Sequence, residues 1–255
     1  MAGIQAVEYL RAFLFGRVGW NRLGSNIVIS GAFGLFRRDG LLNVGGYEHG
    51  VGEDMEVIVR LRRLGYETDV ARQVVFVPDP VAWTEVPESL RVLGRQRDRW
   101  HRGLSDVLWR HRAVLLRRKY GALGLVLFPV FVLIEWFAPV VEAAGLILLL
   151  AGLLVGAVDV PFAILFFSVA YGLGLLMSII AILMEELAFR RYGRPADRAW
   201  LLVWAVVENL GYRQLTMWWR LRGMVGFARG DMDWGAMERT GFAAESASDS
   251  EPAAA

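Results

Sequence analysis

Hydrophobic and polar positions divide this chain into a mixed first part and a strongly apolar second part. Before Pro87, apolar residues come in short groups separated by Gly, Pro and charged side chains, which is typical of a folded domain. After Leu123 the apolar groups become long runs, and the segment 162–184 is one uninterrupted run without a charge. A helix of that length can cross a bilayer. The pattern predicts a folded domain followed by a membrane domain.

The apolar second part predicts two to four membrane spans. Residues 140–158 give a second span, whereas residues 123–137 and 200–219 suit either spans or helices lying in the membrane interface. Three basic clusters flank these runs, and each suits the cytoplasmic side. Two spans place all three clusters there, whereas four spans place one of them on the opposite side.

Two apolar groups in the first part are interpreted as β-strands. Residues 26–36 read as a buried strand that enters a turn at Ser30, Gly31 and Ala32, where small side chains let a ligand approach the backbone. A tight turn with a purely structural role explains these three residues equally well. Residues 68–80 read as a further strand, which two prolines end. Strands alternating with helices predict part of an α/β sheet.

A short helix is predicted to begin at Glu53. Acidic residues fill its first turn, and Gly65 follows its basic last turn. Glu53, Asp54 and Glu56 have two explanations: they only complement the helix dipole, or the helix terminus holds one carboxylate in a cleft. In the second case the positive helix end lowers the pKa of Asp54, which suits a general base.

A basic amphipathic helix is predicted within residues 88–119. This segment has ten Lys or Arg residues and three acids, and its apolar residues follow a helical stripe. Such a helix lies well in a membrane interface beside anionic headgroups. Gln96, Arg99 and Trp100 share one face at spacings i, i+3 and i+4, so all three can reach one ligand. Trp100 is alternatively an aromatic anchor at the interface.

Composition narrows the remaining functional classes. Apolar residues make up 55% of the 255 residues, more than in an average soluble protein. The absence of cysteine excludes disulfides, thiolate metal sites and cysteine nucleophiles. The basic clusters carry no nucleic-acid-binding motif, so nucleic acid is not an expected partner. The segment from Met1 to Trp20 lacks the features of a signal peptide and predicts an amphipathic helix.

Three motifs, in order, resemble those of the membrane-integrated family 2 glycosyltransferases. These motifs are Ser30-Gly31-Ala32, Gly52-Glu53-Asp54 and Gln96-Arg97-Asp98-Arg99-Trp100, with apolar spans after them. The family includes cellulose synthase, hyaluronan synthase and poly-β-1,6-N-acetylglucosamine synthase. The resemblance implies a fold class of a partial glycosyltransferase-A (Rossmann-like) α/β domain, an interfacial amphipathic helix and an α-helical transmembrane domain.

The resemblance also implies a role for each motif. Asp54 matches the base that deprotonates the acceptor sugar hydroxyl, and Glu53 lies beside it. The residues that match the acceptor-binding and substrate-binding positions are Ser30, Gly31, Ala32, Gln96, Arg99 and Trp100. Arginine suits a diphosphate because its planar fork donates two parallel hydrogen bonds, and tryptophan offers a flat face to a sugar ring.

The resemblance leaves one part of the family pattern unmatched. The family's nucleotide-binding half carries acidic motifs for a Mg²⁺ or Mn²⁺ ion, and residues 1–24 contain no Asp-x-Asp. We therefore expect the metal ligands to be mostly absent and the isolated chain to be inactive. The expected domains are 1–87, the C-terminal part of the catalytic domain; 88–119, the interfacial helix; 120–222, the membrane domain; and 223–255, a tail that is disordered from about residue 243.

The expected function is transfer of a sugar from a nucleotide sugar, UDP-linked, to a growing β-linked polysaccharide at the cell membrane. The enzyme would be an inverting hexosyltransferase, multi-pass, with its catalytic elements in the cytoplasm. Three explanations stay open for the unmatched N-terminal half: the sequence is a fragment, the half is encoded separately and acts as a partner, or the protein is a degenerate non-catalytic remnant. One alternative is a non-catalytic subunit or pseudoenzyme of a polysaccharide synthase or export assembly. Another is a transporter-like protein in which Glu135, Glu142 and Glu208 form a polar pathway.

Overall fold

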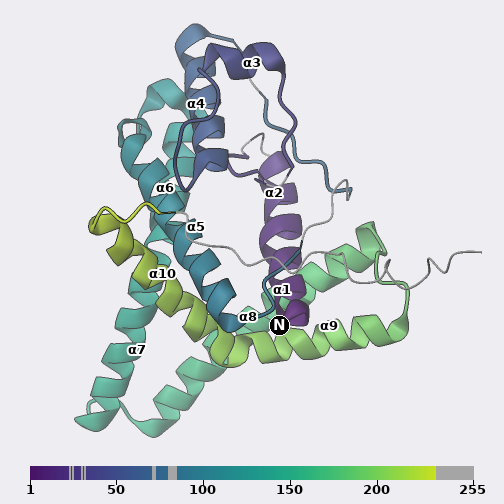
Figure 1. Cartoon of the computed structure of the whole chain (residues 1–255). Helices are drawn as coiled ribbons and strands as arrows, with labels where there is room; N and C mark the ends of the chain where they lie inside the picture. Colours follow the sequence, from purple (N-terminus) through teal and green to yellow (C-terminus); the bar gives the residue numbers. More distant parts are fainter. Residues whose placement is uncertain are drawn as a thin grey trace, which may run out of the picture.

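The chain folds into helices joined by irregular segments, as Figure 1 shows. A computed structural model describes residues 1–22, 24, 26–29, 31, 33–70, 73–79 and 85–233. Within these ranges there is no β-strand. The expected α/β sheet of the glycosyltransferase-A type is therefore wrong for this structure.

Among their described residues, the two segments expected as strands do not pair with each other. The backbone N–H of Phe76 donates to the Asn21 side-chain oxygen at 2.8 Å, and the carbonyl of Asn26 accepts from the Arg62 guanidinium at 3.1 Å. Side chains, rather than a neighbouring strand, satisfy these backbone groups. A pair of short strands is also marginal without a third strand or a covering helix. The local preference of these residues for strand conformation therefore predicted a sheet, but the described residues form none.

The N-terminal segment forms one helical run. It consists of α1 (Ala2–Tyr9), the π-helical η1 (Leu10–Phe15) and α2 (Gly16–Arg22). In Figure 1 this run rises from the N-terminus toward the end of the molecule that holds α3 (Arg38–Asn43) and α4 (Glu53–Thr68). Helix α4 starts at the predicted residue, with its acidic side chains in the first turn.

The basic segment forms α5 (Leu90–Arg110), a helix of 21 residues. The side chain of Ser89 caps its N-terminus by accepting a backbone N–H at 3.3 Å. Two short 3₁₀ turns follow, η2 (Arg112–Val114) and η3 (Arg118–Tyr120). The helix predicted within 88–119 is thus one long helix and two turns.

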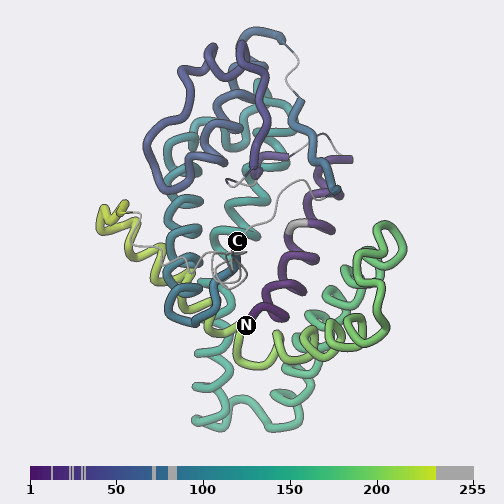
Figure 2. Tube along the Cα trace, turned by 45° about the vertical axis from the view of Figure 1, so that its right-hand side comes forward, coloured from purple at the N-terminus to yellow at the C-terminus, as the bar shows by residue number. Residues whose placement is uncertain are grey.

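Two helical stretches are long and apolar enough to cross a membrane, judged by length and composition: Leu123–Leu154 with 32 residues and Val160–Ala188 with 29. The first stretch consists of η4 (Leu123–Leu127), α6 (Phe128–Val130), η5 (Phe131–Trp136) and α7 (Ala138–Leu154); the second is α8 (Val160–Ala188). The run 123–137 therefore continues into α7. In Figure 2 the turn between α7 and α8 lies at the opposite end of the molecule from α3 and α4.

The last helices return toward α5. They are α9 (Pro195–Val207), the π-type η6 (Glu208–Tyr212) and α10 (Arg213–Ala228). Leu210 and Gly211 are non-helical, and Gly211 has a φ of 84°, so the chain changes direction between α9 and α10. Helix α9 packs on α1 and α8, whereas α10 crosses α5 (Figure 1).

The buried apolar residues form three clusters that connect these elements. The largest joins α4 to the end of α5 and to η4, with Val57, Val107, Leu123 and Phe128 fully buried. A second joins the N-terminal run to α8 and α9, and a third joins α1, α5 and α10. The core between α4 and α5 fixes the two helices that carry the candidate site residues.

Candidate active site

The carboxylate of Asp54 lies directly against the loop that contains Gly31. A Cβ atom on Gly31 would come within 3.3 Å of Asp54 Oδ2, a tight contact that would require the carboxylate to shift by a few tenths of an ångström. Asp54 Oδ1 accepts the backbone N–H of Met55 at 2.8 Å. The structure thus brings together two motifs that lie far apart in the sequence.

The pKa of Asp54 is raised rather than lowered. Burial is the main cause, and it outweighs the backbone hydrogen bond from Met55 and the nearby positive charge of Arg17, which both lower the pKa. The lowering effect predicted for the helix terminus is present in its backbone hydrogen bond, but the predicted net direction is wrong because burial outweighs it. A buried carboxyl with a raised pKa remains a suitable proton acceptor near neutral pH.

Electrostatic interactions link Glu53 to Asp54 and to Arg99, and they link Tyr47 to both acids. Burial raises the pKa of Glu53, and the charge of Asp54 raises it further, while Arg99 lowers it. The pKa of Tyr47 is raised by burial and by the charges of both acids. These mutual effects place the two acids of α4 and Arg99 of α5 within one electrostatic neighbourhood.

A close contact between two glycines sets the distance between α4 and α5. A Cβ on Gly52 would lie 2.8 Å from the carbonyl oxygen of Gly103, and a Cβ on Gly103 would lie 2.9 Å from the Cα of Gly52. The obstructing atoms belong to backbone, which cannot rotate away. Because Gly52 immediately precedes α4, this contact positions the acidic first turn against the middle of α5.

The α5 motif presents its residues at different depths. Gln96 and Arg99 are buried, and Gln96 Oε1 has no hydrogen-bond partner among the described residues. Trp100 is 39% exposed, and the guanidinium carbon of Arg97 lies 4.3 Å from the centre of its ring. A buried amide oxygen without a partner is a suitable acceptor for a ligand hydroxyl.

The remaining candidate residues, Ser30 and Ala32, lie outside the described residues, as does the tail predicted to be disordered from about residue 243. Of the small-residue motif, Gly31 is the residue that the structure places.

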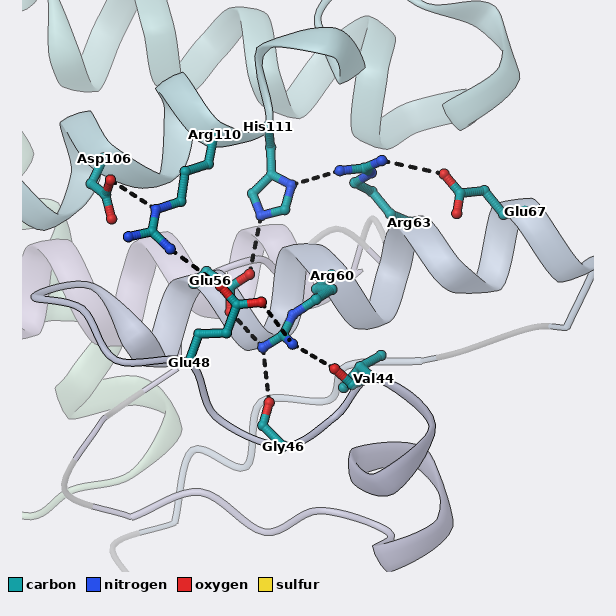
Figure 3. Close-up of polar contacts among 10 residues, drawn as sticks. All are labelled: Val44, Gly46, Glu48, Glu56, Arg60, Arg63, Glu67, Asp106, Arg110 and His111. Carbon is teal, nitrogen blue, oxygen red and sulfur yellow. Dashed lines mark hydrogen bonds and ion pairs between the residues drawn. The ribbon is translucent and has the colours of Figure 1, made fainter.

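A polar cluster on the other side of α4 joins it to the end of α5 (Figure 3). Glu56 accepts from Arg60 at 2.7 Å and lies 3.3 Å from His111 Nε2. Arg63 contacts the other nitrogen of His111 at 2.9 Å. This cluster lines an open pocket of about 440 Å³. Since Arg63 donates a hydrogen bond to Nδ1, Nε2 carries the hydrogen of the neutral imidazole and donates a hydrogen bond to the Glu56 carboxylate.

Arg60 extends this cluster to the loop before α4. Its guanidinium donates to the carbonyl oxygens of Val44 and Gly46, the latter at 2.8 Å, and pairs with Glu48 at 3.1 Å. Gly45 and Gly46 both have positive φ, which lets the loop turn its carbonyls toward Arg60. The loop so held carries Tyr47 to its position beside the acids.

Comparison with known proteins gives the family. Residues 1–184 match the family described as Glycosyl transferase family group 2, which is well over half of the chain. This chain belongs to that family. The resemblance seen in the motifs is confirmed.

Two relatives show how much of a family 2 glycosyltransferase the chain covers. A poly-beta-1,6-N-acetyl-D-glucosamine synthase of Staphylococcus epidermidis is 28% identical over 167 residues, or 65% of this chain and 39% of the relative. The protein of the same name from Staphylococcus aureus (strain COL) is 31% identical over 136 residues, or 52% of this chain and 31% of the relative. The chain therefore matches less than half the length of these relatives. No solved structure matches it.

The described part of this family 2 chain does not fit the metal that the family implies. No group of three His, Asp or Glu side chains within it is arranged to hold a metal ion. Glu53 and Asp54 are neighbours, but Arg17 and Arg99 provide their nearby positive charge.

Two residues of this site were missed in the sequence. Arg17 comes from α2, and Tyr47 comes from the glycine-containing loop before α4. Neither belongs to a motif, and each reaches Asp54 only through the fold. For Tyr47 the sequence offered one signal. Tyr47 directly follows Gly45-Gly46, and a pair of glycines indicates a turn that can hold the next side chain in place.

Proposed function

We propose that this chain carries the acceptor-side part of a membrane-bound family 2 enzyme that extends a β-linked polysaccharide. The donor would be a nucleotide sugar, UDP-linked. The observation that supports this most strongly is the meeting of three separate segments: Gly31 lies against Asp54, and Arg99 acts on the adjacent Glu53. The relatives' name suggests N-acetylglucosamine as the sugar unit.

In this proposal Asp54 accepts the proton of the acceptor hydroxyl as that oxygen attacks the anomeric carbon of the donor. The new glycosidic C–O bond forms on one face while the bond to the diphosphate breaks on the other, so the configuration inverts and the nucleotide diphosphate leaves. A single base is sufficient for such a displacement. Gln96 and Trp100 would hold the acceptor by a hydroxyl hydrogen bond and by ring stacking.

The proposed location is the cell membrane, with the site on the cytoplasmic side and a multi-pass membrane domain. Support comes from the two apolar stretches Leu123–Leu154 and Val160–Ala188 and from the basic residues that flank them. The part that binds the donor and the metal would correspond to the portion of the relatives that this chain does not match.

The test is the substitution Asp54→Asn in a complete enzyme reconstituted in membranes. Loss of the base should reduce sugar transfer by about 10²–10⁴-fold, while helical circular dichroism stays unchanged. Transfer from UDP-N-acetylglucosamine to a short β-1,6-linked N-acetylglucosamine oligosaccharide is the measurement. Turnover close to that of the unsubstituted enzyme would refute Asp54 as the base.

A second candidate function is that of a non-catalytic membrane subunit of a polysaccharide synthase. It is favoured by the lack of a metal-binding group in the described part of the chain. Binding of radiolabelled UDP-N-acetylglucosamine separates the two proposals. A half-enzyme should bind and turn over the donor only when it is combined with a donor-binding partner, whereas a subunit should leave both properties of its partner unchanged when Asp54 is replaced.

A further inference from the structure

Arg97, a residue within the α5 motif to which the motif resemblance assigns no role, covers one side of the Trp100 ring. Its guanidinium carbon lies 4.3 Å from the ring centre, which is stacking distance, and 5.8 Å from the centre of the Tyr9 ring. Arg97 is only 5% exposed, whereas Trp100 is 39% exposed. The buried cation therefore contacts the most exposed residue of the α5 motif.

Arg97 is held directly by Glu8 of α1, and Glu8 is held in turn by Tyr212 of η6. The Nη2 atom of Arg97 pairs with Glu8 at 2.6 Å, and the hydroxyl of Tyr212 donates to the same Glu8 oxygen at 2.7 Å. The ion pair joins side chains that are 5% and 15% exposed. A buried, charge-assisted pair of this kind restricts the guanidinium to one orientation.

We infer that Glu8 and Arg97 are positioning residues, which hold the Trp100 ring at the angle needed to stack on an acceptor saccharide. The inference rests on the proposed function and adds two residues to it. Neither residue touches the saccharide: Glu8 fixes the guanidinium plane, and that plane fixes the indole. A guanidinium is suited to this role because it is planar and stacks, whereas an ammonium is a point charge that does not define an angle.

The experiment uses the full chain in detergent micelles, labelled with 5-fluorotryptophan. The ¹⁹F resonance of Trp100 is assigned by its loss in Trp100→Phe, which is needed because the chain has ten tryptophans. Arg97→Lys keeps the charge and removes the plane, so the Trp100 resonance should move. The affinity for the β-1,6-linked N-acetylglucosamine oligosaccharide, titrated by the same resonance, should fall about tenfold.

Glu8→Gln provides a second variant that keeps the side-chain size and the hydrogen bond from Tyr212. It should shift the Trp100 resonance in the same direction and weaken binding by a smaller factor. The matched control is Arg112→Lys, because Arg112 lies 4.8 Å over the exposed ring of Trp109 in a similar geometry. This control should move the Trp109 resonance and leave oligosaccharide affinity within twofold.

The inference is overturned if the Trp100 resonance stays in place in both variants, if it moves without a loss of affinity, or if the unsubstituted chain does not bind the oligosaccharide. Failure of the proposed base gives a different result. Asp54→Asn would then retain transfer, while Arg97→Lys would still shift the resonance and weaken binding.

Discussion

The junction of α4 with α5 and the hairpin of α7 and α8 depart from the usual distribution of side chains in opposite directions. At the junction, charged and polar residues are buried: Glu56 is 4% exposed and His111 5%. In the hairpin, large apolar residues are exposed: Leu154 is 88% exposed and Leu173 57%. Charged residues are rarely buried without partners, and large apolar surfaces are rarely left facing water.

Each departure has its own physical explanation. The buried charges are paired across elements, so their desolvation is offset by hydrogen bonds that fix geometry. The exposed apolar residues have no such compensation within the described structure, and they suit a surrounding of lipid chains. The comparison shows that the polar junction fixes the relative positions of the site residues, whereas the apolar hairpin provides a surface suited to a lipid environment.

The largest expected effect tests the polar side of this comparison. Glu56→Ala removes one partner of a buried pair and should lower the free energy of unfolding by about 3–5 kcal/mol at pH 7, measured by denaturant titration in mild detergent. Glu48→Ala is the matched control, since Glu48 pairs with the same Arg60 but is 48% exposed, and it should cost less than about 1 kcal/mol. Equal effects of the two substitutions would contradict the conclusion that the buried pair stabilises the junction more than the exposed pair does.

The effect of Glu56 should also depend on pH. Burial raises its pKa, but the hydrogen bonds from His111 and Arg60 outweigh burial and leave the pKa lower than its ordinary value. A depressed pKa in the folded state means that the contribution to stability is complete above the unfolded pKa of about 4.3 and is lost as the pH falls through the folded value. The difference between the unsubstituted protein and Glu56→Ala should therefore shrink below about pH 4.

A second substitution tests the apolar side. Leu173→Arg places a charge near the middle of α8 and should make membrane insertion about 3 kcal/mol less favourable. Insertion into microsomes, scored by carbonate extraction, is the measurement. Leu35→Arg is the control, because Leu35 is 94% exposed in the other half of the molecule and its replacement should leave insertion unchanged. Normal insertion of the Leu173 variant would show that α8 does not face lipid.

The smallest expected effect concerns the glycine contact. Gly103→Ala puts a methyl group against the backbone of Gly52 and should cost about 1–3 kcal/mol in unfolding free energy. Sugar transfer in a complete enzyme should fall with it, because α4 must move away from α5. Gly145→Ala in α7 meets no atom within 4 Å and should be neutral or stabilising. A neutral Gly103→Ala would mean that the two helices tolerate a wider spacing.

The sequence predicted local features of this fold better than long-range ones. The start of α4 follows from acids at successive positions, and the presence of α5 follows from the helical stripe within residues 88–119. Both signals lie within the helix that they predict. The strand predictions failed because a strand exists only if a second segment pairs with it, and no local pattern reports the partner.

The same limit applies to the charged residues. Glu135, Glu142 and Glu208 suggested a polar pathway, yet they pair with Arg220, Arg213 and Arg11 from distant parts of the chain. His101, which follows the α5 motif directly, is 3% exposed, and its pKa is lowered to about 3 by burial and by Arg220. Such contacts, like that of Gly31 with Asp54, depend on which segments meet in space.

The contact between Gly52 and Gly103 has a consequence for how this chain can diverge. In most contacts, a larger side chain at one position can be compensated by a smaller side chain at its neighbour. Here neither residue has a side chain that could become smaller. A change at one position cannot be rescued at the other, so the two positions must persist together through any drift of the surrounding sequence. A pair of glycines at this spacing is therefore a marker by which remote relatives with the same arrangement of α4 and α5 can be found.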